Sequence, residues 1–370
     1  TEVRRDRATR PRSAYPRVVA DGDLGVRVRK HLDLLRPSRR KGISLLRLER
    51  VGAGAEPDAE GAVDVGADSR DQRAPAHANV DRCLVRQVRA RVIDRPHRAL
   101  RADENQAIDT LASQLNDHPR TSEGAFWHNL RYPHQLWLDG VYMGMPFLAH
   151  HATIEGDPHG IEEAVTEALI GHRQLRDADS GLYYHAWDER AEQVWANPET
   201  GLSEFFWSRG MGWYAMALVD LLDFVPEERT DLREPLMEII RGFADTLLAH
   251  RVDGVWYQIT DQPNATGNYA EASGSSMFVY MLAKAVNKGY LDASYRDAVA
   301  ESYERLVAEF VNVSATGAVS LTNVCQVAGL GYGRDGSYRY YMSEPVVSND
   351  PKGVGPFIMA GIEISRMLAN

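Results

Sequence analysis

The sequence predicts an all-α fold, an (α/α)6 toroid in which six helical hairpins close on themselves. Three observations predict it. A unit that begins with glycine recurs beyond residue 101, amphipathic helices alternate with more apolar ones, and no clear run of alternating residues predicts strands. The 370 residues have room for six repeats of about 60 residues each.

The recurring unit opens with Gly, then a small or apolar residue, and often an aromatic one. It reads GAFWH at 124, GLYYH at 181, GVWYQ at 254 and GAVSL at 317, so its glycines are 57, 73 and 63 residues apart. A helical repeat of this length is typical of stacked hairpins. Four copies are visible. The first two hairpins should lie in residues 1–100, where they are not recognisable.

Two kinds of helix alternate between these units. Apolar residues at helical spacing predict amphipathic helices over 161–175, 232–250 and 295–311. Helices richer in small and aromatic residues are predicted between and around them, over 137–149, 206–222, 271–286 and 352–368. Because an amphipathic helix keeps one face for water, we expect the amphipathic set outside and the apolar set inside.

The first hundred residues differ from the rest in charge and aromatic content. They carry 23 Lys and Arg against 14 Asp and Glu, whereas residues 101–370 carry 19 against 38. Tyr15 is their one aromatic residue, and 21 of them are Arg. The chain therefore divides into an anomalous Arg/Ala-rich segment, 1–102, and an expected catalytic barrel region, 103–370.

The leading hypothesis for residues 1–102 is a frame-shifted translation of a GC-rich gene, with the true frame resuming near ENQAIDTLASQL (104–115). Such a chain would lack two hairpins and part of its pocket wall. The alternative is a basic, partly disordered extension that binds an acidic partner. Translating the other two frames upstream of codon 104 distinguishes them, because only a frame shift would reveal aromatic-rich helical hairpins there.

Composition excludes several classes of protein. A content of 44% hydrophobic and 25% charged residues is typical of a soluble globular protein. No apolar run approaches the roughly 20 residues of a membrane span, and no signal peptide is recognised. Cys83 and Cys325 make neither a disulfide framework nor a metal site. We expect a cytoplasmic monomer or weak homo-oligomer without cofactor, metal, nucleic-acid partner or membrane partner.

Polar residues gather before and at the start of the apolar helices, which in a toroid meet at one end. Asp139 is the one carboxylate in YPHQLWLDGVYMGMPFLAHH (132–151), and a carboxylate is rarely buried without a partner or a purpose. Aromatic faces pack on pyranose rings and Arg binds carboxylates through two hydrogen bonds, so the set predicts a pocket for an acidic sugar. The set is His128, His134, Asp139, His185, Trp207, Arg209, Trp213, Glu271, Tyr340, Tyr341, Glu344 and Lys352.

Each candidate also has a structural alternative. Asp139 precedes Gly140, and Asp-Gly is a common turn or cap signal. His128 and His185 lie beside aromatic residues and could be core histidines with satisfied hydrogen bonds. The two tryptophans at i and i+6 could be core residues. Arg209, flanked by small and aromatic residues, would then need a buried partner.

Four motifs resemble glycoside hydrolase family 105, the unsaturated rhamnogalacturonyl hydrolases. They are FWHNLRYPHQLWLDGVYMGMPF, GLYYHAWDE, FWSRGMGWYAMAL and SEPVVSNDPKGVGPF, and the resemblance runs from about residue 103 to the C-terminus. It implies an (α/α)6 barrel that removes a terminal 4,5-unsaturated galacturonyl residue from pectin fragments. The implied partner is a small oligosaccharide with an unsaturated uronic acid end.

The resemblance also implies roles for individual residues. Asp139 would donate a proton to C4 of the unsaturated sugar and assist water at C5. We expect its apolar neighbours to raise the pKa of its carboxyl. Asn129 stands where the family often has Lys, which puts affinity for the acidic end of the substrate in question. The expected substrate-binding residues are His128, His134, Met143, His185, Trp207, Arg209, Trp213 and Lys352.

Three other functions stay open. The first is an unsaturated glucuronyl hydrolase that acts on glycosaminoglycan fragments by the same hydration chemistry. The second is an inactive or carbohydrate-binding toroid. The third is an isomerase or epimerase, which would want several catalytic histidines. Loss of ultraviolet absorbance from an unsaturated rhamnogalacturonan disaccharide would distinguish these possibilities.

Overall fold

The computed structural model describes residues 28–29, 47–48 and 102–369, and the expectations for the remainder of 1–102 lie outside these residues. The chain divides into two compact units. The first comprises residues 1–59 and 313–319. Its described part includes β1 (Val28–Arg29), paired antiparallel with β2 (Arg47–Leu48). The second comprises residues 60–312 and 320–370 and contains all the helices described below.

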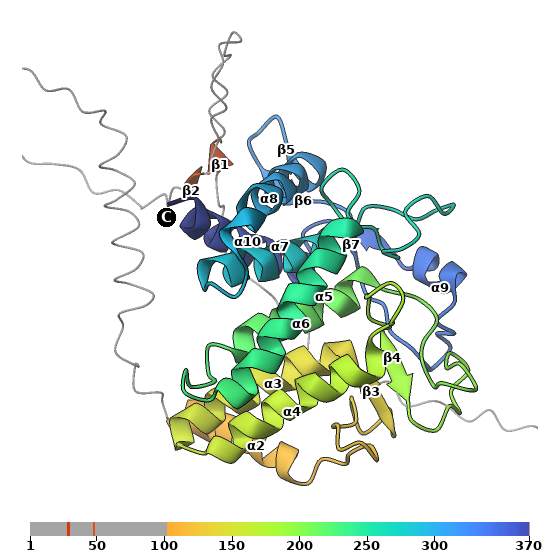
Figure 1. The fold of residues 1–370 in the computed structure, drawn as a ribbon. Coiled ribbons are helices and arrows are strands. Elements are labelled where there is room, and N and C mark those ends of the chain that lie inside the picture. The colour runs from red at the N-terminus through yellow and green to blue at the C-terminus, as the bar shows by residue number, and fades with distance from the viewer. Residues whose placement is uncertain (1–27, 30–46, 49–101, 370) are drawn as a thin grey trace, which may run out of the picture. The chain divides into compact units, whose positions relative to one another are not determined.

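Long helices follow one another through the second unit in the order that the sequence predicts (Figure 1). The three predicted amphipathic helices are present, and their ends differ from the predicted ones by three residues at most. Among the described helices, none is long and apolar enough to cross a membrane. The long helices are α2 (Ala102–Asn116), α3 (Leu138–Glu155), α4 (Pro158–Leu175), α5 (Ser208–Leu221), α6 (Thr230–Ala249), α7 (Ala272–Asn287), α8 (Arg296–Phe310) and α10 (Pro351–Ala369).

The four more apolar helices form an inner row. Helix α5 packs between α3 and α7, and α7 packs between α5 and α10, so that α3 and α10 are the two ends of the row. Helix α4 packs against α3, and α8 packs against α7. Helices α5 and α7 are buried along almost their whole length. In the described residues, the prediction that the apolar helices lie inside is therefore confirmed for α5 and α7, whereas α3 and α10, at the ends of the row, have fewer buried residues than the amphipathic α4.

The glycine of each recurring unit has a left-handed backbone. The φ angles are 93° at Gly124, 77° at Gly181, 85° at Gly254 and 82° at Gly317. Glycine adopts this region without strain because it has no Cβ. The repeat that is visible in the sequence is therefore a repeated turn.

Short strands connect the loops before the inner helices. β3 (Gln135–Trp137) pairs antiparallel with β4 (Ala186–Asp188), with Trp137 opposite Ala186. β7 (Val324–Cys325) pairs antiparallel with β8 (Val346–Val347), with Val324 opposite Val347. These strands are too short for an alternating pattern to predict. The other short elements are η1 (Ala293–Tyr295), β5 (Val311–Val313), β6 (Val319–Leu321) and α9 (Tyr338–Ser343).

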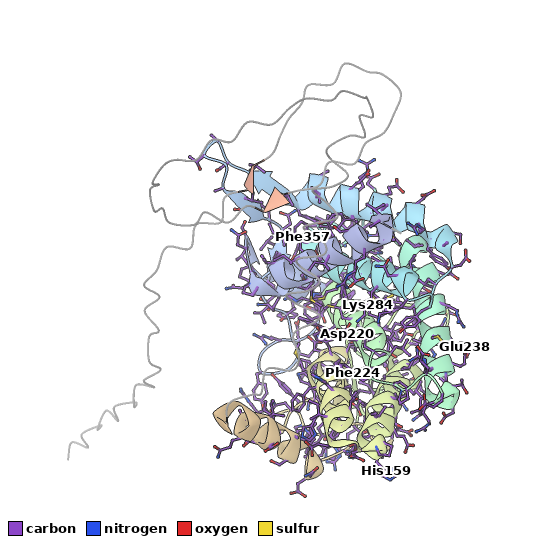
Figure 2. The ribbon with its side chains drawn as sticks, turned by 90° about the vertical axis from the view of Figure 1, so that its left-hand side faces the viewer. His159, Asp220, Phe224, Glu238, Lys284 and Phe357 are labelled. Atoms are coloured by element: carbon purple, nitrogen blue, oxygen red, sulfur yellow. The ribbon has the colours of Figure 1, made fainter. Side chains whose placement is uncertain are left out.

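A buried ion-pair network joins the C-terminal ends of α5 and α7. The Lys284 Nζ lies 2.6 Å from Asp220 Oδ1 and 2.6 Å from Asp223 Oδ2. Tyr280 donates its hydroxyl hydrogen to Asp220 at 2.7 Å, and Lys288 contacts Asp223 at 2.7 Å. Figure 2 labels Asp220 and Lys284 in this region. Each buried charge here has a partner of opposite charge within the protein.

Candidate active site

Each inner helix places its second residue at the same end of the row. These residues are Asp139 of α3, Arg209 of α5, Ser273 of α7 and Lys352 of α10. Helix N-termini carry partial positive charge, so this end of the row favours anions. The expected meeting of these polar side chains at one end is consistent with this arrangement.

Glycine follows the second residue in each of the four helices. A Cβ at Gly140 would lie 2.9 Å from His128 Nδ1, and one at Gly274 would lie 2.7 Å from Ser208 Oγ. At Gly353 the nearest atom, of Val324, would be 2.7 Å away, and at Gly210 the ring of Trp207 would be 3.2 Å away. Side chains and loops therefore pack directly on the backbone of each first turn.

Asp139 is held by a buried histidine. Its Oδ2 lies 3.1 Å from Nε2 of His185, whose side chain has no exposed surface, whereas 18% of the Asp139 side chain is exposed. The other ring nitrogen of His185 lies 2.8 Å from the hydroxyl of Tyr341. Asp139 lies within the helix, and Trp137 occupies the N-cap position, so Asp-Gly is neither a turn nor a cap here.

The expectation of a raised pKa for Asp139 is wrong. Burial raises the pKa of this carboxyl, but the charges and hydrogen bond of His185, with the charges of His128 and Arg209, lower it by more. The pKa therefore lies below its usual value, and the carboxyl is ionised at neutral pH. The apolar residues around Asp139 in the sequence gave the opposite expectation because these three residues come from other segments.

His128 stacks on the aromatic wall of the site. Its ring lies parallel to Trp137, with 4.4 Å between the ring centres. Burial lowers the pKa of His128 to about 4, although Asp139 opposes this, so the ring is neutral at pH 7. Its buried Nδ1 has no hydrogen-bond partner among the described residues. This differs from a core histidine with satisfied hydrogen bonds, because a buried polar atom is normally paired.

Arg209 is a buried cation with neutral partners. Only 1% of its surface is exposed, and its guanidinium donates hydrogen bonds to Ser273 Oγ at 3.3 Å and to the carbonyl of Cys325. Among the described residues, no carboxylate lies within 4.0 Å of it. Glu271 accepts hydrogen bonds from the hydroxyl of Ser273 and the backbone N–H of Cys325. The buried partners that Arg209 was expected to need are therefore a hydroxyl and a carbonyl, and not a carboxylate.

The two predicted tryptophans lie in different places. Trp207 is buried, its ring centre is 4.6 Å from that of His185, and its Nε1 donates to Gln258 Oε1 at 3.1 Å. Trp213 is half-buried and stacks on Tyr142, with 5.0 Å between the ring centres. Trp207 thus belongs to the Asp139 cluster, and Trp213 joins α5 to α3 farther along the helices.

Three other predicted residues have separate surroundings. His134 forms a hydrogen bond with Glu189 through Nδ1 and has φ of 64°. Lys352 pairs with Asp350 at 2.8 Å. The side chain of Met143 is mostly exposed, at 56%. The structure brings together Asp139, His185, His128, Trp207 and Arg209. It shows no contact between this cluster and His134, Lys352 or Met143.

Comparisons with known proteins decide the family. The family model of Glycosyl Hydrolase Family 88 matches residues 70–368. The chain belongs to this family. A solved structure from C. acetobutylicum ATCC 824, described as a glycoside hydrolase from family 105, is 40% identical with a TM-score of 0.69; the match covers 78% of this chain and 79% of that one. The predicted family 105 membership and (α/α)6 toroid are therefore confirmed.

Two named relatives of this family 88 chain match it over a shorter range. The unsaturated rhamnogalacturonyl hydrolase YesR of Bacillus subtilis is 28% identical over 173 residues, which are 44% of this chain and 46% of the relative. An unsaturated 3S-rhamnoglycuronyl hydrolase of Formosa agariphila is 31% identical over 177 residues, 46% of this chain and 45% of the relative. Family membership makes this chain a glycoside hydrolase and implies an oligosaccharide substrate.

Sequence reasoning overlooked several residues of this family 88 site. Ser273 and Gln258 directly hold Arg209 and Trp207, and Tyr341, though noticed, was not assigned a role. A signal for Ser273 exists in the sequence, because the four inner helices begin with Asp-Gly, Arg-Gly, Ser-Gly and Lys-Gly at matching positions. Gln258 ends the GVWYQ unit, where its amide carries no chemical signal by itself.

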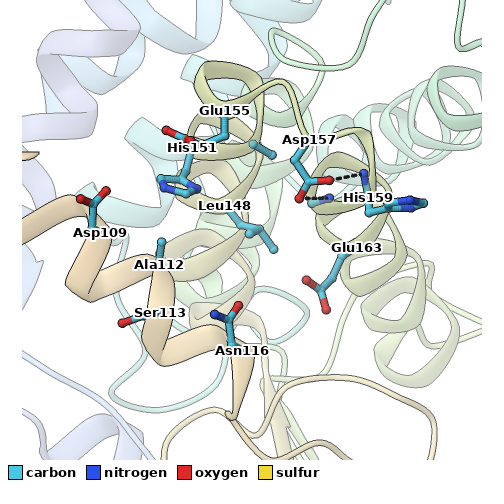
Figure 3. A pocket seen from close by; sticks show the side chains of 12 residues that line it. Asp109, Ala112, Ser113, Asn116, Leu148, His151, Glu155, Asp157, His159 and Glu163 are labelled. Carbon is cyan, nitrogen blue, oxygen red and sulfur yellow. Dashed lines mark hydrogen bonds between the residues drawn. The ribbon is translucent and has the colours of Figure 1, made fainter.

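A cleft elsewhere on this family 88 chain has a different character. It has a volume of about 490 Å³ and lies between α2, the C-terminal half of α3 and the start of α4 (Figure 3). Four carboxylates, those of Asp109, Glu155, Asp157 and Glu163, are among its lining residues. An acidic cleft at the far end of α3 from Asp139 does not suit an acidic sugar. Among the described residues, no group of three or more His, Cys, Asp or Glu could hold a metal ion.

Proposed function

We propose that this chain removes a terminal 4,5-unsaturated galacturonyl residue from rhamnogalacturonan oligosaccharides by hydrating the C4=C5 double bond. The observation that carries the proposal is the carboxyl of Asp139 beside Arg209, a buried cation without a carboxylate partner among the described residues. An acidic sugar supplies the missing anion, because Arg binds a carboxylate in a planar, bidentate manner. The name of the Bacillus subtilis relative supports the same substrate class.

In this proposal Asp139 transfers the protons of the reaction. The carboxyl donates a proton to C4, water adds at C5, and the carboxylate takes a proton from that water. The product at C5 is a hemiketal, which opens and releases the neighbouring sugar. His128, Trp207 and Arg209 are the proposed sugar-binding residues, with Trp213, His134, Met143 and Lys352 as less direct candidates. The sequence also assigned His185 to the sugar, but its buried ring is bonded through both nitrogens to Asp139 and Tyr341, so we propose that it acts through Asp139.

The low pKa of Asp139 requires that a proton arrives with the substrate. In the free protein the carboxyl is ionised, because His185, His128 and Arg209 outweigh burial. A substrate carboxylate near Arg209 adds a like charge next to Asp139 and offsets part of the field of Arg209, and both effects raise the pKa of Asp139. We therefore propose that binding of the anionic sugar is coupled to proton uptake by Asp139.

The test is incubation with an unsaturated rhamnogalacturonan disaccharide while the ultraviolet absorbance of the conjugated double bond is followed. We expect the absorbance to fall, and faster at pH 5 to 6 than at pH 8. A folded protein that leaves the absorbance unchanged would contradict the proposal. An unsaturated glycosaminoglycan disaccharide in parallel tests a second candidate, an unsaturated glucuronyl hydrolase. The name of the Formosa agariphila relative, an unsaturated 3S-rhamnoglycuronyl hydrolase, supports an unsaturated uronyl substrate and is compatible with both candidates.

Residues 103–370 are the proposed catalytic region. The hypothesis of a shifted reading frame before codon 104 stays a prediction, which the nucleotide sequence tests. If it holds, a gene with the frame restored should encode a more active and more stable enzyme than this chain. Equal activity and stability of the two proteins would return residues 1–102 to the alternative of a basic extension.

A further inference from the structure

His185 connects Asp139 to a buried tyrosine. Nε2 of the ring lies 3.1 Å from Asp139 Oδ2, and Nδ1 lies 2.8 Å from the hydroxyl of Tyr341. His185 and Tyr341 are both fully buried. The three residues come from three segments, with Asp139 on α3, His185 one residue before β4, and Tyr341 on α9. A histidine bonded through both nitrogens has its orientation fixed by its partners.

The hydroxyl of Tyr341 determines which nitrogen of His185 carries hydrogen. Burial raises the pKa of Tyr341 well above its usual value, so the hydroxyl keeps its proton. A buried hydroxyl needs an acceptor, and among the described residues Nδ1 of His185 is its hydrogen-bond partner. The tyrosine therefore donates to Nδ1, and a neutral ring carries its hydrogen on Nε2, where it donates to Asp139.

We propose that Tyr341 is a positioning residue, which fixes His185 in the Nε2–H form and thereby commits Oδ2 of Asp139 to that hydrogen bond. Oδ1 is then the oxygen that exchanges protons with the substrate. The part that concerns His185 stands on the geometry alone, whereas the part that concerns Oδ1 rests on the proposed function. Because the Nε2–H bond stabilises the ionised carboxyl, Tyr341 also influences the pH at which Asp139 gains its proton.

Other charged and titratable groups lie near Asp139, His185 and Tyr341. His128 and Arg209 act on Asp139 through their position, and Tyr340 and Cys325 lie near Tyr341. Among the described residues, the side-chain hydrogen bond to Asp139 comes from His185. A change confined to the hydroxyl of Tyr341 therefore alters this hydrogen bond and leaves the four other groups in place.

The chain offers a matched control in a second histidine–tyrosine pair. The hydroxyl of Tyr183 lies 2.7 Å from Nδ1 of His172, and Tyr183 is as deeply buried as Tyr341. Its ring packs against Tyr214 and Phe243, between the inner and outer helices. Tyr183→Phe thus removes the same atom from the same kind of pair, without touching Asp139.

In kinetics, Tyr341→Phe should lower kcat by about tenfold with KM within about twofold, because it disturbs orientation and not binding. The alkaline limb of the kcat profile should move to higher pH, since His185 is no longer held in the Nε2–H form and its hydrogen bond to the ionised Asp139 is weakened. Tyr183→Phe should change neither quantity. An unmoved limb in folded Tyr341→Phe would overturn the proposal, whether or not kcat falls, because a merely structural role would not move it.

A second measurement uses the substrate-free parent protein and decides even if Tyr341→Phe does not fold. Histidine labelled with ¹⁵N gives distinct nuclear magnetic resonance shifts for protonated and unprotonated ring nitrogens, and the loss of one set in His185→Gln assigns it. We expect hydrogen on Nε2 of His185 and none on Nδ1. Hydrogen on Nδ1 would overturn the proposal. If the Nε2–H form is found in a protein that turns over no unsaturated disaccharide, the proposed function fails and the role of Tyr341 in fixing His185 stands.

Discussion

Two buried cations lie at opposite ends of the inner helices, and their partners differ. Lys284 has two carboxylates at 2.6 Å. Burial lowers the pKa of Lys284, but Asp220 and Asp223 raise it by more. Arg209 has a hydroxyl and a carbonyl, and no carboxylate within 4.0 Å among the described residues. We infer that at the C-terminal ends of the inner helices the charge of Lys284 is balanced within the protein. At their N-terminal ends, the charge of Arg209 is available to an anionic ligand.

The largest effect is expected from a substitution that breaks the ion-pair network around Lys284. Lys284→Met leaves Asp220 and Asp223 partly buried without their shared cation, so the free energy of unfolding should fall by about 3 kcal/mol. The rate of turnover per folded molecule should not change, because the network lies far from Asp139. Urea unfolding and initial rates measure the two quantities. Lys288→Met, at a half-exposed position whose ion pair among the described residues is with Asp223, should cost less than about 1 kcal/mol.

The next effect concerns the carboxyl of Asp139, at the N-terminal ends of the inner helices. Asp139→Asn should lower kcat on the order of 10²-fold or more, because the proton donor is lost; this is roughly 2.7 kcal/mol of activation free energy. The midpoint of thermal unfolding should stay close to that of the parent. Activity within tenfold of the parent in a folded protein would refute the role of Asp139.

Arg209→Lys tests whether the unpaired cation binds the substrate carboxylate. Lysine keeps the charge and loses the planar, two-armed donor, so KM should rise about twentyfold, or roughly 1.8 kcal/mol of binding free energy. Steady-state kinetics on the unsaturated disaccharide measure it. If KM and kcat both stay unchanged, Arg209 has only a structural role, as Lys284 does, and does not bind the substrate carboxylate.

The last effect is a slope, small for each pH unit, and concerns a carboxyl that lies outside both ends of the row. Burial raises the pKa of Glu167 to about 8, against which its hydrogen bond from the backbone N–H of Phe126 acts only weakly. The folded protein holds this proton where the unfolded chain releases it. Its stabilising contribution is therefore complete at low pH and is lost as the pH rises toward 8, by at most about 1.4 kcal/mol per pH unit. Glu167→Gln should flatten that dependence in unfolding experiments between pH 5 and 8; an unchanged slope would contradict the raised pKa.

The fold was predictable because its signals are local and repeated. Glycine at 124, 181, 254 and 317 marks a turn of the same conformation each time, and the apolar period of α4, α6 and α8 fixes their ends closely. The short strands β3 and β7 gave no signal, since two or three residues cannot show alternation.

The site was predictable in part. Asp139 and Arg209 stood out because each is a charge in an apolar segment. The direction of the pKa shift of Asp139 was not predictable from its neighbours in the sequence, because His185 is 46 residues away and Tyr341 a further 156. His134 was grouped with the site by its position in the sequence, whereas its left-handed backbone and its hydrogen bond with Glu189 depend on the fold.

The polar residue followed by glycine at the start of each inner helix has a consequence for how such a site can diversify. The absence of a side chain at each glycine lets the first turn pack closely on its neighbour, as Gly274 does on Ser208, so we expect this packing to persist when the preceding residue is exchanged. Asp, Arg, Ser and Lys now occupy the four preceding positions. We therefore expect that substitutions at these four positions, in evolution or by design, can change the chemistry of the site one residue at a time while the packing of the helices is kept.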